Sequence, residues 1–161
     1  MGADNQQERL DERWISGFVD GEGCFYVGIN RQPKMSLGYQ VLPEFRIVQH
    51  KRDVEILHRI KQFFGFGKVT VNHGDRMEFR VRGLSNLNRL LEFFEASPLQ
   101  TTKSESFTQF KKIIELMNRK EHLTQDGLQR IAHLASTMNQ RTKTRCLVSS
   151  ETICQNSRVS E

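Results

Sequence analysis

Alternating polar and apolar residues in two parts of the chain restrict the folds that it can form. The strands predicted within residues 39–49 and 68–82 change polarity with a period of two, which is typical of a β-sheet with one buried face. The apolar positions are Val41, Pro43, Phe45, Ile47, Val69, Val71, Phe79 and Val81. His73-Gly74-Asp75 predicts the turn of a hairpin. An antiparallel sheet of this kind carries helices on its apolar face and leaves the other face polar.

Apolar residues at helical spacing lie between and after these strands. The predicted helices cover residues 10–19, 54–64, 84–94, 107–117 and 128–138, and a first strand covers 24–30. Asp53 is the predicted N-cap of the second helix, and Ser97-Pro98 interrupts the chain after the third. Pro43 has no N–H to donate and argues against a central place in the sheet at that point. The order αββαββα predicts the α+β class, with a four-stranded antiparallel sheet and additional C-terminal helices.

The length of 161 residues suits one domain with a buried core, which we expect to span residues 5–140. Residues 141–161 are rich in Ser, Thr and Arg without periodicity, which predicts a flexible or late-docking tail. No apolar run reaches membrane-spanning length, and the polar start does not resemble a signal peptide. Cys24, Cys146 and Cys154 form no C-x-x-C pair, so we expect no zinc site, no disulfide framework and a reducing, intracellular setting.

The basic residues are concentrated in the part of the chain that contains the predicted strands. The whole chain has a net charge of +5. Residues 24–82 contain eleven Lys and Arg against five Asp and Glu, an excess of six, so that all other residues together carry −1. This distribution indicates a surface for a polyanion. A generic solvated basic surface is the alternative.

The first helix leads into two carboxylates, each followed by a glycine, in Asp20-Gly21-Glu22-Gly23. The C-terminal end of a helix carries partial negative charge, so acidic residues are unfavourable there. A divalent cation with oxygen ligands is the simplest group that would offset this cost. Gly17 and Gly21 lie four residues apart on one side of the helix and would permit another backbone to approach closely. A glycine-rich helix end with two incidental acids is the alternative.

The stretch Gly17-Phe18-Val19-Asp20-Gly21-Glu22-Gly23-Cys24-Phe25 resembles the motif of the LAGLIDADG homing endonucleases, although Ile15-Ser16 replace its initial Leu-Ala. The resemblance extends over about residues 14–139 and implies a saddle-shaped sheet that lies in the major groove of DNA. Because the chain contains one copy of the motif, it implies a homodimer with two motif helices packed together. The implied dimer interface contains Trp14, Gly17, Phe18, Asp20 and Gly21.

The resemblance also implies the catalytic residues. Glu22 would bind the catalytic metal, with Gly21 beside it, and Mg²⁺ is the expected cofactor. Gln49 would order active-site waters, and Lys103 would lie near the scissile phosphate. A basic residue that some relatives carry shortly after this glutamine is replaced by Asp53, so Lys51 or Arg52 would have to supply that charge. The alternatives are that Gln49 is an ordinary residue at the end of a strand and that Lys103 is an ordinary solvated residue in the first turn of a helix.

Side chains on the polar face of the sheet are candidates for reading DNA, because Arg pairs with guanine, Asn or Gln with adenine, and Glu with cytosine. The DNA-binding candidates are Tyr26, Asn30, Gln32, Gln40, Glu44, Arg46, Lys68, Thr70, Asn72, Arg76, Glu78 and Arg80. An ordinary solvent-facing sheet would look similar, and the excess of basic charge favours the DNA-binding interpretation.

The resemblance implies a site-specific double-strand DNA endonuclease that cuts a long pseudo-palindromic site and promotes the homing of an intron, expected to be of group I. The expected partners are double-stranded DNA and a second copy of the chain, without a membrane or a small-molecule substrate. A relative that binds DNA or RNA without cleavage, such as an intron maturase or regulator, is the main alternative. The third possibility is an α+β interaction protein. The host compartment, an organelle or a microbial cytoplasm, stays open.

Overall fold

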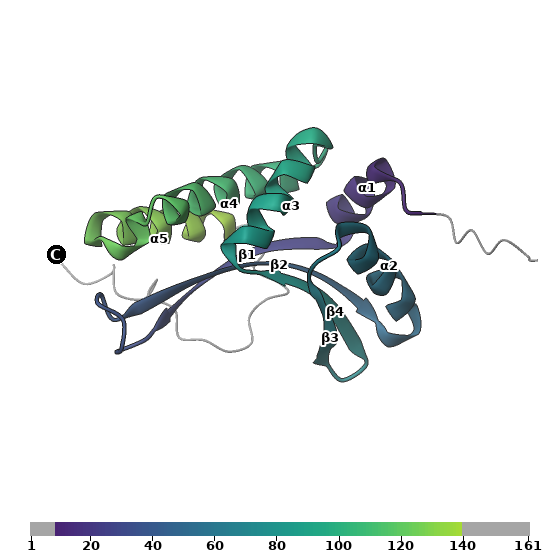
Figure 1. The fold of residues 1–161 in the computed structure, drawn as a ribbon, viewed down its shortest axis with the longest axis horizontal. Helices are drawn as coiled ribbons and strands as arrows, with labels where there is room; N and C mark the ends of the chain where they lie inside the picture. Colours follow the sequence, from purple (N-terminus) through teal and green to yellow (C-terminus); the bar gives the residue numbers. More distant parts are fainter. Residues whose placement is uncertain (1–8, 140–161) are drawn as a thin grey trace, which may run out of the picture.

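Two antiparallel β-hairpins lie side by side in the protein, and helices cover one face of the resulting arched sheet (Figure 1). The computed structural model describes residues 9–139, so the predicted tail at 141–161 lies outside the described residues. In chain order the elements are α1 (Glu12–Glu22), β1 (Gly23–Arg31), β2 (Tyr39–His50), the 3-10 turn η1 (Lys51–Asp53), α2 (Val54–Phe64), β3 (Lys68–His73), β4 (Arg76–Arg82), α3 (Leu84–Ala96), α4 (Lys103–Asn118), the 3-10 turn η2 (Glu121–Leu123) and α5 (Gln125–Asn139). The predicted α+β class and element order are confirmed.

The strand order is β1-β2-β4-β3, so the two central strands come from different hairpins. β2 pairs with β1 over residues 39–47 and with β4 over residues 44–50. Pro43 therefore lies just outside the pairing with β4, where its missing N–H removes no bond to that strand. The sequence argued against a central place in the sheet at Pro43. This is correct for Pro43 itself, although β2 is a central strand from Glu44 onward.

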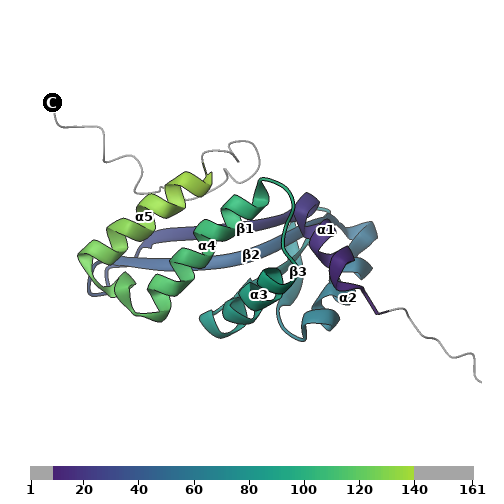
Figure 2. The same ribbon diagram turned by 90° about the horizontal axis from the view of Figure 1, so that it is seen from above.

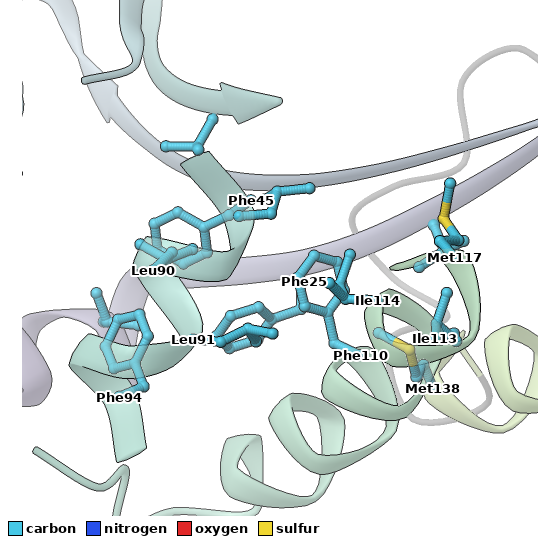
Figure 3. Packing of buried hydrophobic residues seen from close by; sticks show 14 of the residues in the cluster. Phe25, Phe45, Leu90, Leu91, Phe94, Phe110, Ile113, Ile114, Met117 and Met138 are labelled. Atoms are coloured by element: carbon cyan, nitrogen blue, oxygen red, sulfur yellow. The ribbon is translucent and has the colours of Figure 1, made fainter. Parts of the chain in front are cut away.

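Phenylalanine rings join the apolar face of the sheet to the helices above it. The ring of Phe25 on β1 lies with its centroid 5.2–5.9 Å from four others, and it packs between α3 and α4 (Figure 3). These four partners are Phe45, Phe94, Phe107 and Phe110. Two of them belong to α4, so this contact seats α4 on β1, as seen from above in Figure 2. The start of α4 is thereby held near the end of α1.

Helix α1 is longer than its apolar periodicity predicts and extends past Val19 to Glu22. Both acids of the motif therefore lie in its last turn. Gly23, the next residue, has an extended conformation with φ −72° and ψ 153°, so the helix does not end in a left-handed glycine. A Cβ atom at Gly23 would lie 2.6 Å from Cγ1 of Val19 and 3.3 Å from the ring of Phe45. Close packing at the junction of α1 and β1 thus requires this glycine.

The N-terminus of α2 also differs in detail from the prediction. Asp53 occupies the N-cap position, but its side chain makes no capping bond and pairs with Arg52 at 3.3 Å. The preceding 3-10 turn is capped instead by His50, whose Nδ1 accepts the N–H of Arg52. Lys51 pairs with Asp75 at 2.6 Å.

Among residues 9–139, no helix combines the length and the apolar character needed to cross a bilayer.

Candidate functional site

Glu22 and Gln49 meet where the end of α1 passes the end of β2. Nε2 of Gln49 donates to Oε2 of Glu22 at 3.2 Å, and the carboxylate is exposed. The sheet register explains this contact, since Gly23 pairs with Ile47 and Gln49 follows two residues later on the same face. The structure therefore brings together two of the predicted catalytic residues, which are 27 positions apart in the sequence.

Lys103, the first residue of α4, reaches the same corner from the other side. Its Nζ donates to the carbonyl oxygen of Gly23 at 2.5 Å, and the side chain is half-buried. Burial lowers the pKa of Lys103 below its ordinary value, and attraction to Cys24, Asp20 and Glu22 offsets only part of this effect. The ammonium group thus supplies positive charge where α1 ends with two carboxylates.

Asp20 faces the linker between α3 and α4. Oδ2 accepts the N–H of Gln100 at 2.8 Å, and Oδ1 accepts the N–H and the hydroxyl of Thr101 at 3.1 Å and 2.8 Å. The Thr101 hydroxyl in turn accepts the N–H of Lys103 at 3.2 Å. Burial acts to raise the pKa of Asp20, but the hydrogen bonds from Gln100 and Thr101 and the charge of Lys103 lower it below its ordinary value. Asp20 therefore ties the end of α1 to the start of α4.

Replacing Asp20 by asparagine is expected to destabilise the fold by about 1 kcal/mol at neutral pH, because the amide nitrogen that replaces one carboxylate oxygen cannot accept a hydrogen bond. Partial screening of the site by solvent keeps the loss this small. Since the folded-state pKa of Asp20 is depressed, its contribution is full above the unfolded pKa of about 3.9. It disappears as the pH falls through the lower, folded-state pKa. Urea melts at pH 7 and pH 3 measure the difference, and Glu92→Gln, at an exposed position within α3, is the control. An equal loss of stability at both pH values would contradict this role.

The oxygen ligands needed for a metal ion are only partly supplied by one chain. Among residues 9–139, no three His, Cys, Asp or Glu side chains lie close enough together to hold a metal. The exposed Glu22 carboxylate and the Gly21 carbonyl, in the last turn of α1, are hard oxygen donors of the kind that Mg²⁺ and Ca²⁺ bind. These residues fit a divalent cation if a further carboxylate comes from another molecule.

The outer side of α1 carries an apolar stripe in which Trp14 is exposed and Phe18 is partly buried. Trp14 and Phe18 stack with their ring centroids 4.9 Å apart, and Trp14 is 42% exposed. A Cβ atom built at Gly17 or Gly21 would meet no described atom within 4 Å, so neither glycine is required by packing within this chain. Ile15 and Val19, which directly follow Trp14 and Phe18 in the sequence, fill the core from the adjacent side of the helix. The stripe is therefore available for contact with another molecule.

The helices leave one face of the sheet uncovered (Figure 1). The strand register places the predicted DNA-binding residues that lie within strands on this face. Cross-strand pairs place Tyr26 beside Glu44, Arg46 beside Arg80, and Thr70 beside Glu78. Asn30 pairs with Gln40 and Lys68 with Arg80 in the same way, while Arg76 pairs with His50 and Gln32 follows the end of β1. Alternation along the strands accounts for the common face of the members that lie within strands, whereas Gln32 follows the end of β1.

Two residues that make contacts in the site, Arg82 and Thr101, were not among the predicted catalytic and DNA-binding residues. Arg82 pairs with Glu44 at 2.5 Å, and Thr101 links Asp20 to Lys103. The alternation of β4 already placed Arg82 on the polar face, so a signal for it existed. Thr101 lies 81 positions from Asp20, and no local pattern indicates that contact.

Together, the fold and the site define an α+β protein with a basic sheet face and a carboxylate at the end of one helix. The sequence profile described as LAGLIDADG endonuclease matches residues 15–114. The chain belongs to the LAGLIDADG endonuclease family.

Relatives and solved structures agree with this assignment. "Probable intron-encoded endonuclease 3" of Neurospora crassa is 32% identical over 129 residues, covering 78% of this chain and 24% of that protein. The crystal structure of the homing endonuclease I-TnaI is 54% identical with a TM-score of 0.79, covering 81% of this chain and 88% of the other. I-SmaMI, solved bound to an uncleaved DNA target in the presence of calcium ions, is 34% identical with a TM-score of 0.79 and covers 81% of this chain and 45% of the other.

The match covers 24–29% of the length of three curated relatives from Podospora anserina and Neurospora crassa. An uncharacterized protein encoded in ND4 intron 1 of Podospora anserina, for example, is 38% identical over 117 residues, which are 71% of this chain and 26% of that protein. DNA endonuclease I-CvuI of Chlorella vulgaris is more similar in length, since its 32% identity covers 57% of each chain.

Proposed function

We propose that this chain is one subunit of a homodimeric, site-specific endonuclease that cuts both strands of a long pseudo-palindromic DNA site. Its gene would lie in an intron, and the uninterrupted allele, in an organelle or a microbial cell, would be the substrate. The membership in the LAGLIDADG endonuclease family and the DNA-bound structures of I-SmaMI and I-CpaMI support the choice of DNA.

The observation that carries the proposal is the convergence of Glu22, Gln49 and Lys103 at one corner of the fold. A carboxylate, an amide and an ammonium group meet there from α1, β2 and α4. Hydrolysis of a phosphodiester needs a positioned water and compensation of negative charge as the bond breaks. A protein that only bound nucleic acid would need neither the exposed Glu22 carboxylate nor the half-buried Lys103 at this place.

We assign Glu22 and Gly21 as ligands of a divalent cation, with Mg²⁺ as the expected ion. When bound, the cation would activate water and stabilise the leaving oxygen. Gln49 donates to Glu22 and so orients the carboxylate, while its carbonyl oxygen is an acceptor suited to water. The Lys103 ammonium group would neutralise charge on the scissile phosphate.

Incubation with duplexes that carry the uninterrupted host-gene sequence tests the activity. Cleavage of both strands is expected with Mg²⁺, and chelation of the metal should stop it. A protein that binds such a duplex tightly and cuts neither strand with any divalent cation would instead be the non-cleaving binder. Absence of both binding and cleavage would overturn the proposal as a whole.

The exposed stripe of α1 is our proposed dimer interface, comprising Trp14, Gly17, Phe18 and Gly21, with Asp20 at its end. Two copies packed through this helix would bring two Glu22 carboxylates toward the symmetry axis. Each chain supplies one exposed carboxylate at this place, so pairing would complete the ligand set. The two sheets would then form one continuous DNA-binding surface.

Replacing Gly17 by leucine is expected to raise the stability of the isolated chain and abolish dimerisation. The position is open within the chain, and leucine is favoured over glycine in a helix by about 0.8 kcal/mol. The new side chain would, however, separate two closely packed α1 helices. Sedimentation gives the oligomeric state, and thermal unfolding at protein concentrations low enough for both proteins to be monomeric gives the stability. Gln62→Leu, on the exposed side of α2, is the control. A Gly17→Leu protein that stays dimeric would rule out this interface.

A further inference from the structure

Two glutamates are buried in the basic face of the sheet. Glu44 is 4% exposed and Glu78 is 3% exposed, although both lie on the face that the helices leave uncovered. A glutamate that reads a cytosine must present a carboxylate oxygen to the amino group of the base. At this degree of burial neither side chain projects far enough from the surface to do so. Both residues therefore need another explanation than the predicted reading of bases.

Both carboxylates are engaged through each of their oxygens. Oε1 of Glu44 pairs with Nε of Arg46 at 3.0 Å, and Oε2 pairs with Nε of Arg82 at 2.5 Å. Oε1 of Glu78 pairs with Nη1 of Arg80 at 3.2 Å, and Oε2 accepts from Nδ2 of Asn72 at 2.7 Å. Each glutamate thus binds one arginine of its own strand and one side chain of a neighbouring strand.

The sheet register shows why acids are needed here. Arg46 lies directly opposite Arg80, and Arg80 lies directly opposite Lys68, so three cations form one row across β2, β4 and β3. Like charges that face each other across strands are destabilising. Glu44 and Glu78 lie two residues before Arg46 and Arg80 on the same face. They supply the negative charge that lets this cationic row persist before DNA is bound.

The arginines, in contrast, reach the surface. The side chain of Arg46 is 22% exposed and that of Arg80 is 29% exposed. Arg46 is also held by the ring of Tyr26, whose centroid lies 4.9 Å from Cζ. Its contact with Glu44 uses Nε, whereas the terminal nitrogens of a guanidinium form the fork that matches O6 and N7 of guanine. Arg80 contacts Glu78 through one terminal nitrogen, Nη1, so this argument about the fork applies to Arg46 alone. Fixing a long side chain before binding reduces the entropy that binding would cost.

We propose that Glu44 and Glu78 are positioning residues of the DNA-binding face, which hold Arg46 and Arg80 for the recognition of bases and touch no base themselves. The inference rests on the proposed function, because it assumes that this face binds duplex DNA. It assigns base recognition to the arginines and removes the two glutamates from the residues that contact bases.

A sequence-preference profile tests this assignment. The full-length protein is used to enrich duplexes from a library of random double-stranded DNA, and the preference at each base pair is measured. Arg46→Gln identifies the base pair that Arg46 reads. Glu44→Asp keeps the charge but shortens the side chain by one methylene, and it should reduce discrimination at that same base pair about tenfold. In the Arg46→Gln background, Glu44→Asp should have no further effect at that base pair.

The controls separate this proposal from its alternatives. Glu92→Gln changes an exposed acid on α3, away from the sheet face, and should leave the profile unchanged. An unchanged profile in folded Glu44→Asp would overturn the positioning role. The positioning role would also be overturned if Glu44→Gln changed the preferred base from cytosine to adenine at a base pair that Arg46→Gln leaves unaffected. Glu44 would then contact that base directly. The pair Glu78→Asp and Arg80→Gln repeats the test at the second site if Glu44 variants do not fold. Wild-type protein that enriches no sequence would overturn the proposed function and this inference with it.

Discussion

Glu22→Gln is expected to reduce the rate of DNA cleavage by at least about a thousandfold, because binding of a catalytic metal is worth several kcal/mol in the transition state. The substitution keeps the shape of the side chain and removes the negative charge that would bind the cation. Affinity for the target duplex should be nearly unchanged, since the predicted DNA contacts lie on the sheet. Cleavage under single-turnover conditions and binding in Ca²⁺ measure the two effects separately.

The matched control for this variant is Glu92→Gln, which removes one negative charge from an exposed position of α3. It should cleave like the wild type. Unchanged cleavage by Glu22→Gln would remove Glu22 from the active site, and parallel loss of binding and cleavage would indicate a structural role instead.

Lys103→Met is expected to lower the rate of cleavage by about 100- to 1000-fold, which is typical when one group that stabilises transition-state charge is removed. Methionine fills much of the same half-buried space but cannot donate to the Gly23 carbonyl or offset the charges of Asp20 and Glu22. Burial lowers the pKa of Lys103, so its charged form is lost at a lower pH than in an ordinary lysine, and cleavage by the wild type should fall as the pH is raised through this lowered pKa.

Lys112→Met provides the control for Lys103→Met, because Lys112 lies exposed further along the same helix. Cleavage by this variant should match the wild type. If Lys103→Met also cleaved at the wild-type rate over the whole pH range, Lys103 would have only a structural function at the end of α1.

Much of the architecture follows from local patterns. The two-residue period of Val41, Phe45 and Ile47 predicted the buried face of β2, and the same period placed Arg46 on the opposite face. Such patterns succeed because the side chains of a strand alternate whatever it pairs with. Helix ends were less certain, since α1 continues to Glu22 although its apolar periodicity stops at Val19.

Contacts between distant parts of the chain could not be predicted in the same way. Asp20 accepts hydrogen bonds from the linker about 80 residues away, and its polarity alone gives no sign of this partner. Glu44 and Glu78 show the same limit, because alternation placed them on the polar face but could not show that neighbouring arginines bury them. Burial depends on the size and direction of cross-strand neighbours, which only the strand register defines.

Short-range spacing and residue type were enough to predict the α+β class, the apolar and basic faces of the sheet, and the motif that contains Glu22. Which polar groups meet depends instead on how the whole chain folds. The tertiary structure brought Gln49 and Lys103 to the end of α1, and it joined Asp20 to the start of α4. The physical reason is that a hydrogen bond or ion pair requires atoms within about 3 Å, and packing of Phe25 against α4 together with the β1–β2 register sets those distances.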